Sequence, residues 1–150
     1  MNAVSQGLRT GLLAAALAAF TSAAVAAEIG QIKVAKGQVS VERKGETLAA
    51  TVGLRLEAAD VVRTGADGSV GITMSDNSLL SAGPNSALAL ERFEFDPTTS
   101  QGRFDSQLRR GTLAVVSGRI AKQSPEAMTV RTPSAVLGVR GTEFVVAVDE

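Results

Sequence analysis

The sequence of 150 residues contains no cysteine, histidine, tryptophan or tyrosine. Without cysteine there is no disulfide and no thiolate nucleophile, and without histidine there is neither a His-based triad nor a Cys/His zinc site. The fifteen Lys and Arg residues equal the fifteen Asp and Glu residues, so the chain lacks the basic field that drives nonspecific binding of nucleic acid. These absences exclude many enzymes and predict one domain that binds no nucleic acid.

The first 27 residues have the pattern of a secretory signal peptide. Arg9 supplies a positive charge, an apolar run covers residues 11–20, and residues 24–27 are small, as a cleavage site requires. A membrane anchor is the alternative, but the run is Ala-rich and shorter than the roughly 20 apolar residues that span a bilayer. We therefore predict a cleaved signal peptide, a mature chain without a transmembrane segment, and a periplasmic or secreted location.

After the signal-like segment, apolar residues recur at every second position, which is the period of a half-buried strand. The clearest alternations are Ile32/Val34, Val39/Val41, Leu54/Leu56, Val70/Ile72/Met74, Leu88/Leu90, Leu113/Val115 and Phe144/Val146/Val148. Turn sequences separate them at residues 44–46, 65–68, 75–78, 83–85 and 97–99. A weak helical pattern covers residues 47–59, and the polar residues 96–105 predict a hairpin tip or flexible loop. The fold class we predict is all-β, with short strands in a two-sheet, β-solenoid-like roll or sandwich.

Two glycine-rich segments are candidates for an anion-binding loop. In residues 60–74 the glycines are spaced by three, but the Gly-Lys-Ser/Thr ending of a phosphate loop is missing. We predict a tight turn there, in which Gly68 takes a positive φ. The second segment, residues 132–144, is dense in Gly, Arg and Thr, and we expect Gly138 and Gly141 to allow bends or a close approach of the sheet.

Candidates for catalysis and metal binding are weak. Asp60, Asp76 and Glu143 are carboxylates that could form the acid/base pair of glycoside hydrolysis, but nothing in the sequence places two of them together. Asp67, Asp76 and Asn77 lack the alternating spacing of a calcium loop. We therefore expect no enzyme activity, no catalytic residues, no cofactor and no metal, and the sequence leaves the binding residues open.

Eight short motifs follow one another in an order that resembles the FecR domain family. They are Gly37-Gln38-Val39, Gly53-Leu54-Arg55-Leu56, Asp60-Val61-Val62-Arg63-Thr64-Gly65, Asp67-Gly68-Ser69-Val70, Gly83-Pro84-Asn85-Ser86, Gly111-Thr112-Leu113, Thr132-Pro133-Ser134-Ala135 and Val139-Arg140-Gly141-Thr142-Glu143-Phe144. The resemblance extends over residues 30–148. It implies an all-β, solenoid-like periplasmic module for signal transduction, which binds envelope proteins such as the signalling domain of a TonB-dependent outer-membrane transporter.

The chain departs from the regulators of that family, which carry a sigma-binding segment and a transmembrane helix before the domain. We expect a signal peptide at residues 1–27 and a FecR-like β domain at 28–150, either minimal or truncated at its C-terminus. The first function to consider is a non-enzymatic periplasmic binding or signalling module that engages periplasmic or outer-membrane proteins. The alternative is a cell-wall glycan or small-ligand binding domain. The lack of Trp and Tyr weakens this alternative, because sugar sites commonly stack their rings on aromatic side chains. Of the aromatic residues that remain, Phe93 and Phe95 fit the core better than a binding site.

The last apolar stretch, residues 142–148, raises the question of self-association. If it forms a strand at a sheet edge, its free backbone groups can pair with a partner or with a second copy. If it lies between the strands around residues 113–116 and 128–130, a Lys at position 145 or 146 would bury a charge. We expect the edge position and self-association of the mature domain through this strand.

Overall fold

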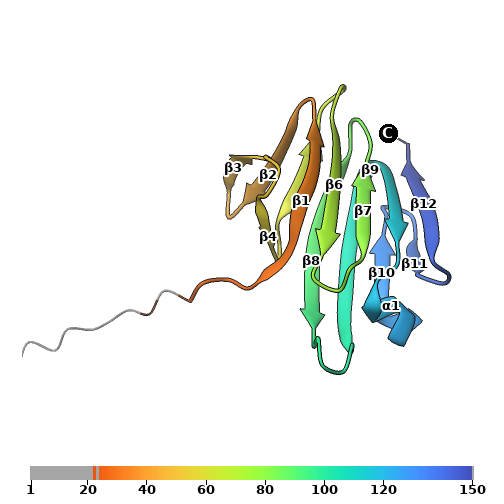
Figure 1. The fold of residues 1–150 in the computed structure, drawn as a ribbon. Helices are drawn as coiled ribbons and strands as arrows, with labels where there is room; N and C mark the ends of the chain where they lie inside the picture. Colours follow the sequence, from red (N-terminus) through yellow and green to blue (C-terminus); the bar gives the residue numbers. More distant parts are fainter. Residues whose placement is uncertain (1–21, 23, 150) are drawn as a thin grey trace, which may run out of the picture.

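The computed structural model describes residue 22 and residues 24–149, and it shows an all-β protein (Figure 1). The strands are β1 (Glu28–Lys36), β2 (Val39–Arg43), β3 (Glu46–Ala49), β4 (Arg55–Glu57), β5 (Val61–Thr64), β6 (Ser69–Met74), β7 (Leu79–Ala82), β8 (Ala87–Phe95), β9 (Gly102–Val116), β10 (Met128–Arg131), β11 (Val136–Gly138) and β12 (Glu143–Val148). Two short helical elements follow β9, namely α1 (Arg119–Gln123) and the 3-10 turn η1 (Pro125–Ala127). Residues 1–21 and 23 of the predicted signal peptide lie outside the described residues.

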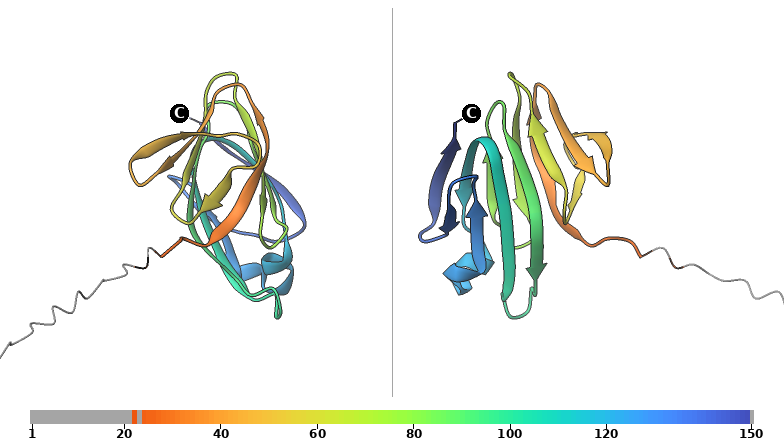
Figure 2. Two further views of the ribbon diagram at one scale, coloured as in Figure 1. Left: turned by 60° about the vertical axis from the view of Figure 1, so that its left-hand side comes forward. Right: turned by 180° about the vertical axis from the view of Figure 1, so that it is seen from behind.

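The strands form one curled sheet whose two halves meet in β9 (Figure 2). We call β3, β2, β5, β8, β10 and β11, with residues 102–110 of β9, the β8 half. The β7 half contains β4, β1, β6, β7 and β12, with residues 111–116 of β9. Neighbouring strands are antiparallel except for the parallel pair of β10 with β9. The predicted two-sheet or solenoid arrangement is not confirmed, because one hydrogen-bonded path joins the strands.

Glycine 111 stands where β9 passes from one half to the other. Its φ is +87°, and a Cβ atom there would lie 2.1 Å from the Ser86 hydroxyl oxygen. Both the backbone conformation and the close approach therefore require glycine at this position. The bend lets the same strand pair with β8 and then with β7.

The core lies inside the curl, where the inward members of the predicted alternations are buried. They include Ile32, Val41, Leu56, Val70, Ile72, Met74, Leu88, Leu90, Leu113, Val115 and Val146. Val34 is an exception, since a bulge between Ile32 and Val34 turns it outward and leaves it 45% exposed. β12 pairs with β9 and with no other described strand, so it lies at an edge as predicted, with Val145 outward and Val146 inward.

The predicted turns are confirmed, but three local predictions are wrong or incomplete. Gly68 does not have a positive φ; it is needed because a Cβ atom would lie 2.3 Å from the Gln38 carbonyl oxygen. Residues 47–59 hold β3 and β4 instead of a helix, since Gly53 and Ala59 have positive φ values that interrupt a right-handed helix. The tip of the β8–β9 hairpin covers residues 96–101, whereas β9 already begins at Gly102.

Candidate functional site

Asp76, a candidate acid/base residue and metal ligand, is fully buried in the turn between β6 and β7. Its carboxylate accepts hydrogen bonds from the Ser78 backbone N–H at 2.9 Å, the Ser78 hydroxyl at 2.8 Å and the Ile120 N–H at 3.2 Å. The carboxylate thus accepts a hydrogen bond from an N–H group in the first turn of α1, although the two residues are 44 positions apart in the chain. These contacts explain Asp76 as a residue that holds α1 on the sheet.

Asp60, the second candidate carboxylate, is 1% exposed and lies just before β5. It accepts two hydrogen bonds from the Arg43 guanidinium, at 2.9 Å and 2.7 Å, and one from the Glu57 N–H at 2.9 Å. Arg43 also pairs with the Glu57 side chain at 3.1 Å. The hydrogen bond to Asp60 raises the pKa of Arg43, and this fork-shaped pairing ties β2 to the end of β4.

The structure does not bring the candidate catalytic residues together. Asp60 and Asp76 each have their own buried partners, and Glu143 is exposed at the start of β12. The Asp67 side chain accepts a hydrogen bond from the Gln38 backbone N–H in an exposed turn. Within the described part of the chain, no group of three or more acidic residues is placed to hold a metal ion.

The second glycine-rich segment forms a turn and a bend. The Ala135 N–H donates to the Thr132 hydroxyl oxygen at 3.1 Å, which closes a turn before β11. Gly141 has a φ of +96°, so the predicted bend is present, but a Cβ atom at Gly138 or Gly141 would meet nothing within 4 Å. Of the two alternatives predicted for these glycines, the bend is therefore the correct one and the close approach is not, and the neighbouring Arg140 is exposed.

Charged side chains gather on the outer face of the β8 half, and we call this set the charged strip. It consists of Glu91, Arg92 and Glu94 on β8, Arg103 and Asp105 on β9, and Thr129 and Arg131 on β10. Arg92, Arg103 and Arg131 are 54%, 44% and 48% exposed. A groove of about 330 Å³ runs between these side chains. Three ion pairs lie in the strip, namely Arg92–Glu94, Arg103–Asp105 and Arg131–Glu91.

Two ion pairs of the charged strip form within single strands. Arg92 pairs with Glu94 at 3.1 Å, and Arg103 pairs with Asp105 at 2.9 Å. In each pair the partners are two residues apart, so both side chains project from the same face of the strand. The hydrogen bond with Asp105 raises the pKa of Arg103. The exposed guanidinium groups are thus held in place by neighbouring carboxylates.

Two further contacts cross between strands. The Thr129 hydroxyl donates to Asp105 at 2.7 Å, and Arg131 on β10 reaches over β9 to bind Glu91 on β8. Burial raises the pKa of Asp105, but hydrogen bonds from Arg103 and Thr129 lower it more, so the net pKa lies below its usual value. The hydrogen bond with Glu91 raises the pKa of Arg131. These contacts join β8, β9 and β10 in one network of paired charges.

Sequence reasoning did not identify the charged strip, although a signal was present. Charged and apolar residues alternate in residues 92–95 and again in residues 103–105. The apolar members pack inside, where Phe104 is fully buried and meets the Phe93 ring edge-on at 5.2 Å. The charged members of the same alternation form the outer face.

Comparison with protein-family models matched residues 60–150 to the family described as FecR protein. The charged strip lies wholly within this match. Comparisons with curated proteins and with solved structures found no match. In the residues that the structure describes, no helix is long and apolar enough to cross a membrane.

Proposed function

The chain belongs to the FecR family, and on that premise we propose that it is a non-enzymatic binding or signalling module of the cell envelope. The family is associated with signalling regulators of iron transport. The module would act in the periplasm, after removal of residues 1–27, by engaging an envelope protein such as the signalling domain of an outer-membrane transporter. The pattern of the first 27 residues supports this location.

The charged strip is the observation that carries the proposed binding role. A guanidinium has five N–H donors, and Arg103 and Arg131 each use one of them in the hydrogen bonds described above. Their other donors can bind carboxylate or backbone oxygen atoms of a partner protein. Because the pairs are already formed, little side-chain entropy remains to be lost on binding. A polar, partly acidic segment of an envelope protein fits this surface best.

A regulatory rather than catalytic role is supported by what the buried carboxylates do. Asp60 and Asp76 are engaged by Arg43, Ser78 and the N–H groups near them, which leaves them no role with a substrate. The glycan alternative has less support, because the rings it would use are engaged elsewhere. Phe104 is buried, and Phe95 lies beneath the Arg119 guanidinium at 5.0 Å.

The location can be tested by expressing the full sequence in a Gram-negative host and fractionating the cells. We expect the protein in the periplasmic fraction, with a mature N-terminus near Glu28 in its mass spectrum. An intact Met1 form in the inner membrane would contradict both the signal peptide and the proposed location.

The binding role can be tested by site-specific photo-crosslinking in cells. A crosslinker at Arg92 should capture a defined envelope protein, whereas one at the exposed Thr47 on β3 should not. Arg92→Glu combined with Arg131→Glu should abolish the capture from a crosslinker at Val136, which lines the same groove. Arg55→Glu, at a 75% exposed position on the other half, is the matched control. Equal capture at positions 92 and 47 would overturn the proposal.

A further inference from the structure

The outer face of the β7 half differs in character from the charged strip, and we call it the apolar face. Between the charged residues at its two edges, its outward side chains are uncharged along five neighbouring strands, β1, β6, β7, β9 and β12. They are Val34, Gly71, Thr73, Leu79, Ser81, Thr112, Ala114, Val116, Val145 and Ala147. Leu79, Val116 and Val145 are 45%, 37% and 69% exposed. Such a largely apolar sheet face is typical of a surface that another sheet covers.

The strand register arranges this face symmetrically about β7, the middle strand of the five. One row runs from Glu143 on β12 through Val116, Leu79 and Thr73 to Gln31 on β1. Leu79, on β7, is the centre of this row.

The next row has the same form. It runs from Val145 through Ala114, Ser81 and Gly71 to Val34, with Ser81 at its centre. A rotation of 180° about an axis that runs parallel to β7 would place a second copy face to face with the first. Each row of the face would then lie on the same row of the second copy, in the reverse direction.

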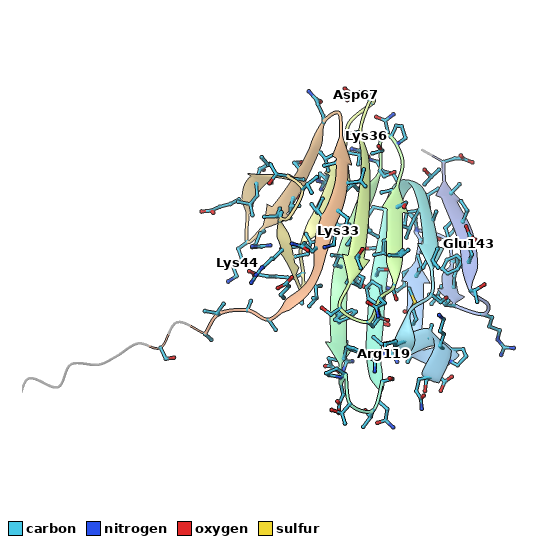
Figure 3. All side chains as sticks on the ribbon, in the orientation of Figure 1. Lys33, Lys36, Lys44, Asp67, Arg119 and Glu143 are labelled. Carbon is cyan, nitrogen blue, oxygen red and sulfur yellow. The ribbon has the colours of Figure 1, made fainter. Side chains whose placement is uncertain are left out.

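Charges of opposite sign stand at the two edges of the apolar face. Lys33 and Lys36 belong to β1, and Glu143 belongs to β12 on the far side (Figure 3). The Lys33 ammonium donates to the Gln31 side-chain oxygen at 2.5 Å, so it lies in the row that ends at Glu143. Neither Lys36 nor Glu143 forms an ion pair within the residues that the structure describes.

We propose that a second copy of this chain packs on the apolar face, with a two-fold axis along β7. This symmetry brings Leu79 against Leu79 of the second copy, and Ser81 against its Ser81. Val34 meets Val145 at both ends of the second row. Lys33 meets Glu143, so charges of opposite sign from the two edges face each other across the interface. The charged strip stays free on the other outer face of each copy.

The size of the face sets the expected strength. Five strands about 4.8 Å apart, each contributing about five residues of 3.4 Å, span roughly 400 Å² per copy. The total buried area, roughly 800 Å² plus the side-chain rims, lies below the roughly 1,200–2,000 Å² of stable interfaces and in the range of weak, transient ones. We therefore expect a reversible dimer with a dissociation constant in the micromolar range.

Sedimentation equilibrium of the purified protein over about 5 to 500 µM measures this association. We expect a monomer–dimer equilibrium that Leu79→Arg shifts at least tenfold toward monomer, because two arginines would meet at the axis. Val136→Arg, at a 67% exposed position on the β8 half, should leave it unchanged. Circular dichroism of each variant establishes that it is folded. A monomer at all concentrations, or a dimer that Leu79→Arg leaves intact, overturns the proposal, and the latter result would favour pairing through the β12 edge.

Charge exchange and crosslinking test the geometry itself. Lys33→Glu and Glu143→Lys should each weaken the dimer, and the double variant should restore it, since the exchanged charges meet again. The chain has no cysteine, so Ser81→Cys introduces a single thiol. A short bis-maleimide should link Ser81→Cys into a covalent dimer much faster than Val136→Cys. Equal rates, or a double variant no better than its parents, would overturn the axis along β7.

Discussion

The two halves of the sheet treat charge in opposite ways. The β8 half carries its charges in the middle of its outer face and pairs them locally, as Arg103 does with Asp105. The β7 half keeps charge out of the middle of its face, and at its edges Lys36 and Glu143 form no ion pair with any residue that the structure describes. Local pairing yields a surface that is stable in water and ready for a polar partner. Opposite charges at separate edges of a face instead favour a partner that carries a negative charge opposite the lysines and a positive charge opposite Glu143.

The two halves also differ in how they satisfy a buried aspartate. Asp60 is neutralised by the Arg43 guanidinium, which joins the β8 half to the end of β4. Asp76, in the β7 half, is held by N–H and hydroxyl donors from Ser78 and Ile120. A buried carboxylate can thus be satisfied by one cation or by several neutral donors, and the cost of removing it should differ accordingly.

Removal of the Asp76 carboxylate should have the largest effect. Asp76→Ala leaves three buried donors without an acceptor and detaches the first turn of α1, so we expect a loss of about 4 kcal/mol in the free energy of unfolding. Chemical denaturation measures the change. Asp67→Ala, in an exposed turn, should cost less than about 1 kcal/mol. An Asp76→Ala variant as stable as the parent would remove the contrast between the two aspartates.

Breaking the Arg43 pair should have a somewhat smaller effect. Arg43→Met leaves the buried Asp60 charge without its cation, and because Arg43 is 22% exposed we expect a loss of about 2–3 kcal/mol. Adding Asp60→Asn should recover more than half of it, since no buried charge remains. Thermal unfolding of the single and double variants gives the coupling. If the losses in stability from the two substitutions simply added, Arg43 and Asp60 would not be energetically coupled.

The bend between β11 and β12, which links the two halves, should be less sensitive. Gly141→Ala places a Cβ atom in open space but at a φ of +96°, so we expect a loss of about 1 kcal/mol from backbone strain alone. Gly138→Ala, also in open space but without a positive φ, is the control and should change stability by less than about 0.5 kcal/mol. Equal losses at both positions would mean that strain at Gly141 is not the cause.

The smallest expected effect is the difference between the two outer faces in how acid changes stability. Because the pKa of Asp105 is lower when folded, its stabilising contribution is present above its unfolded pKa of about 3.9 and is lost as the pH falls through the folded value. We expect this contribution to be at most about 1 kcal/mol. Thr129→Val should raise the pKa of Asp105 and flatten the melting temperature between pH 2.5 and 5.

A matched substitution on the apolar face completes this test. Thr112→Val replaces an exposed threonine of the β7 half and should leave the acid profile of the melting temperature unchanged. If both threonine variants changed the profile equally, the low-pH loss would not come from the charged strip.

The strands and turns could be predicted from the sequence because they depend on local alternation. Val70, Ile72 and Met74, for example, are buried as their spacing indicates. The helix α1 could not be predicted, since it has five residues and depends on Asp76, which lies 44 residues before Ile120. The reason for glycine at position 68 could not be predicted either, because it is the close approach of the Gln38 carbonyl group, which lies 30 residues earlier in the chain.

The candidate surfaces could be predicted only in part. The alternation in residues 103–105 indicates which side chains face outward, but the ion pair of Arg131 with Glu91 depends on the parallel pairing of β10 with β9. The symmetry of the apolar face depends likewise on β7 lying in the middle, between β9 and β6. Such neighbours are far apart in the chain, and periodicity carries no information about them.

The shared strand β9 also orders the events of folding. β7 and β8 follow one another in the chain, yet both form hydrogen bonds with β9, so neither half can be completed until residues 102–116 are available. Before that point the chain holds two unfinished sheets with open edges and exposed core residues. We expect hydrogen exchange to protect both halves in a single late step, because closing these long-range contacts is slow. A chain that ends before residue 102 would then need shielding by a chaperone.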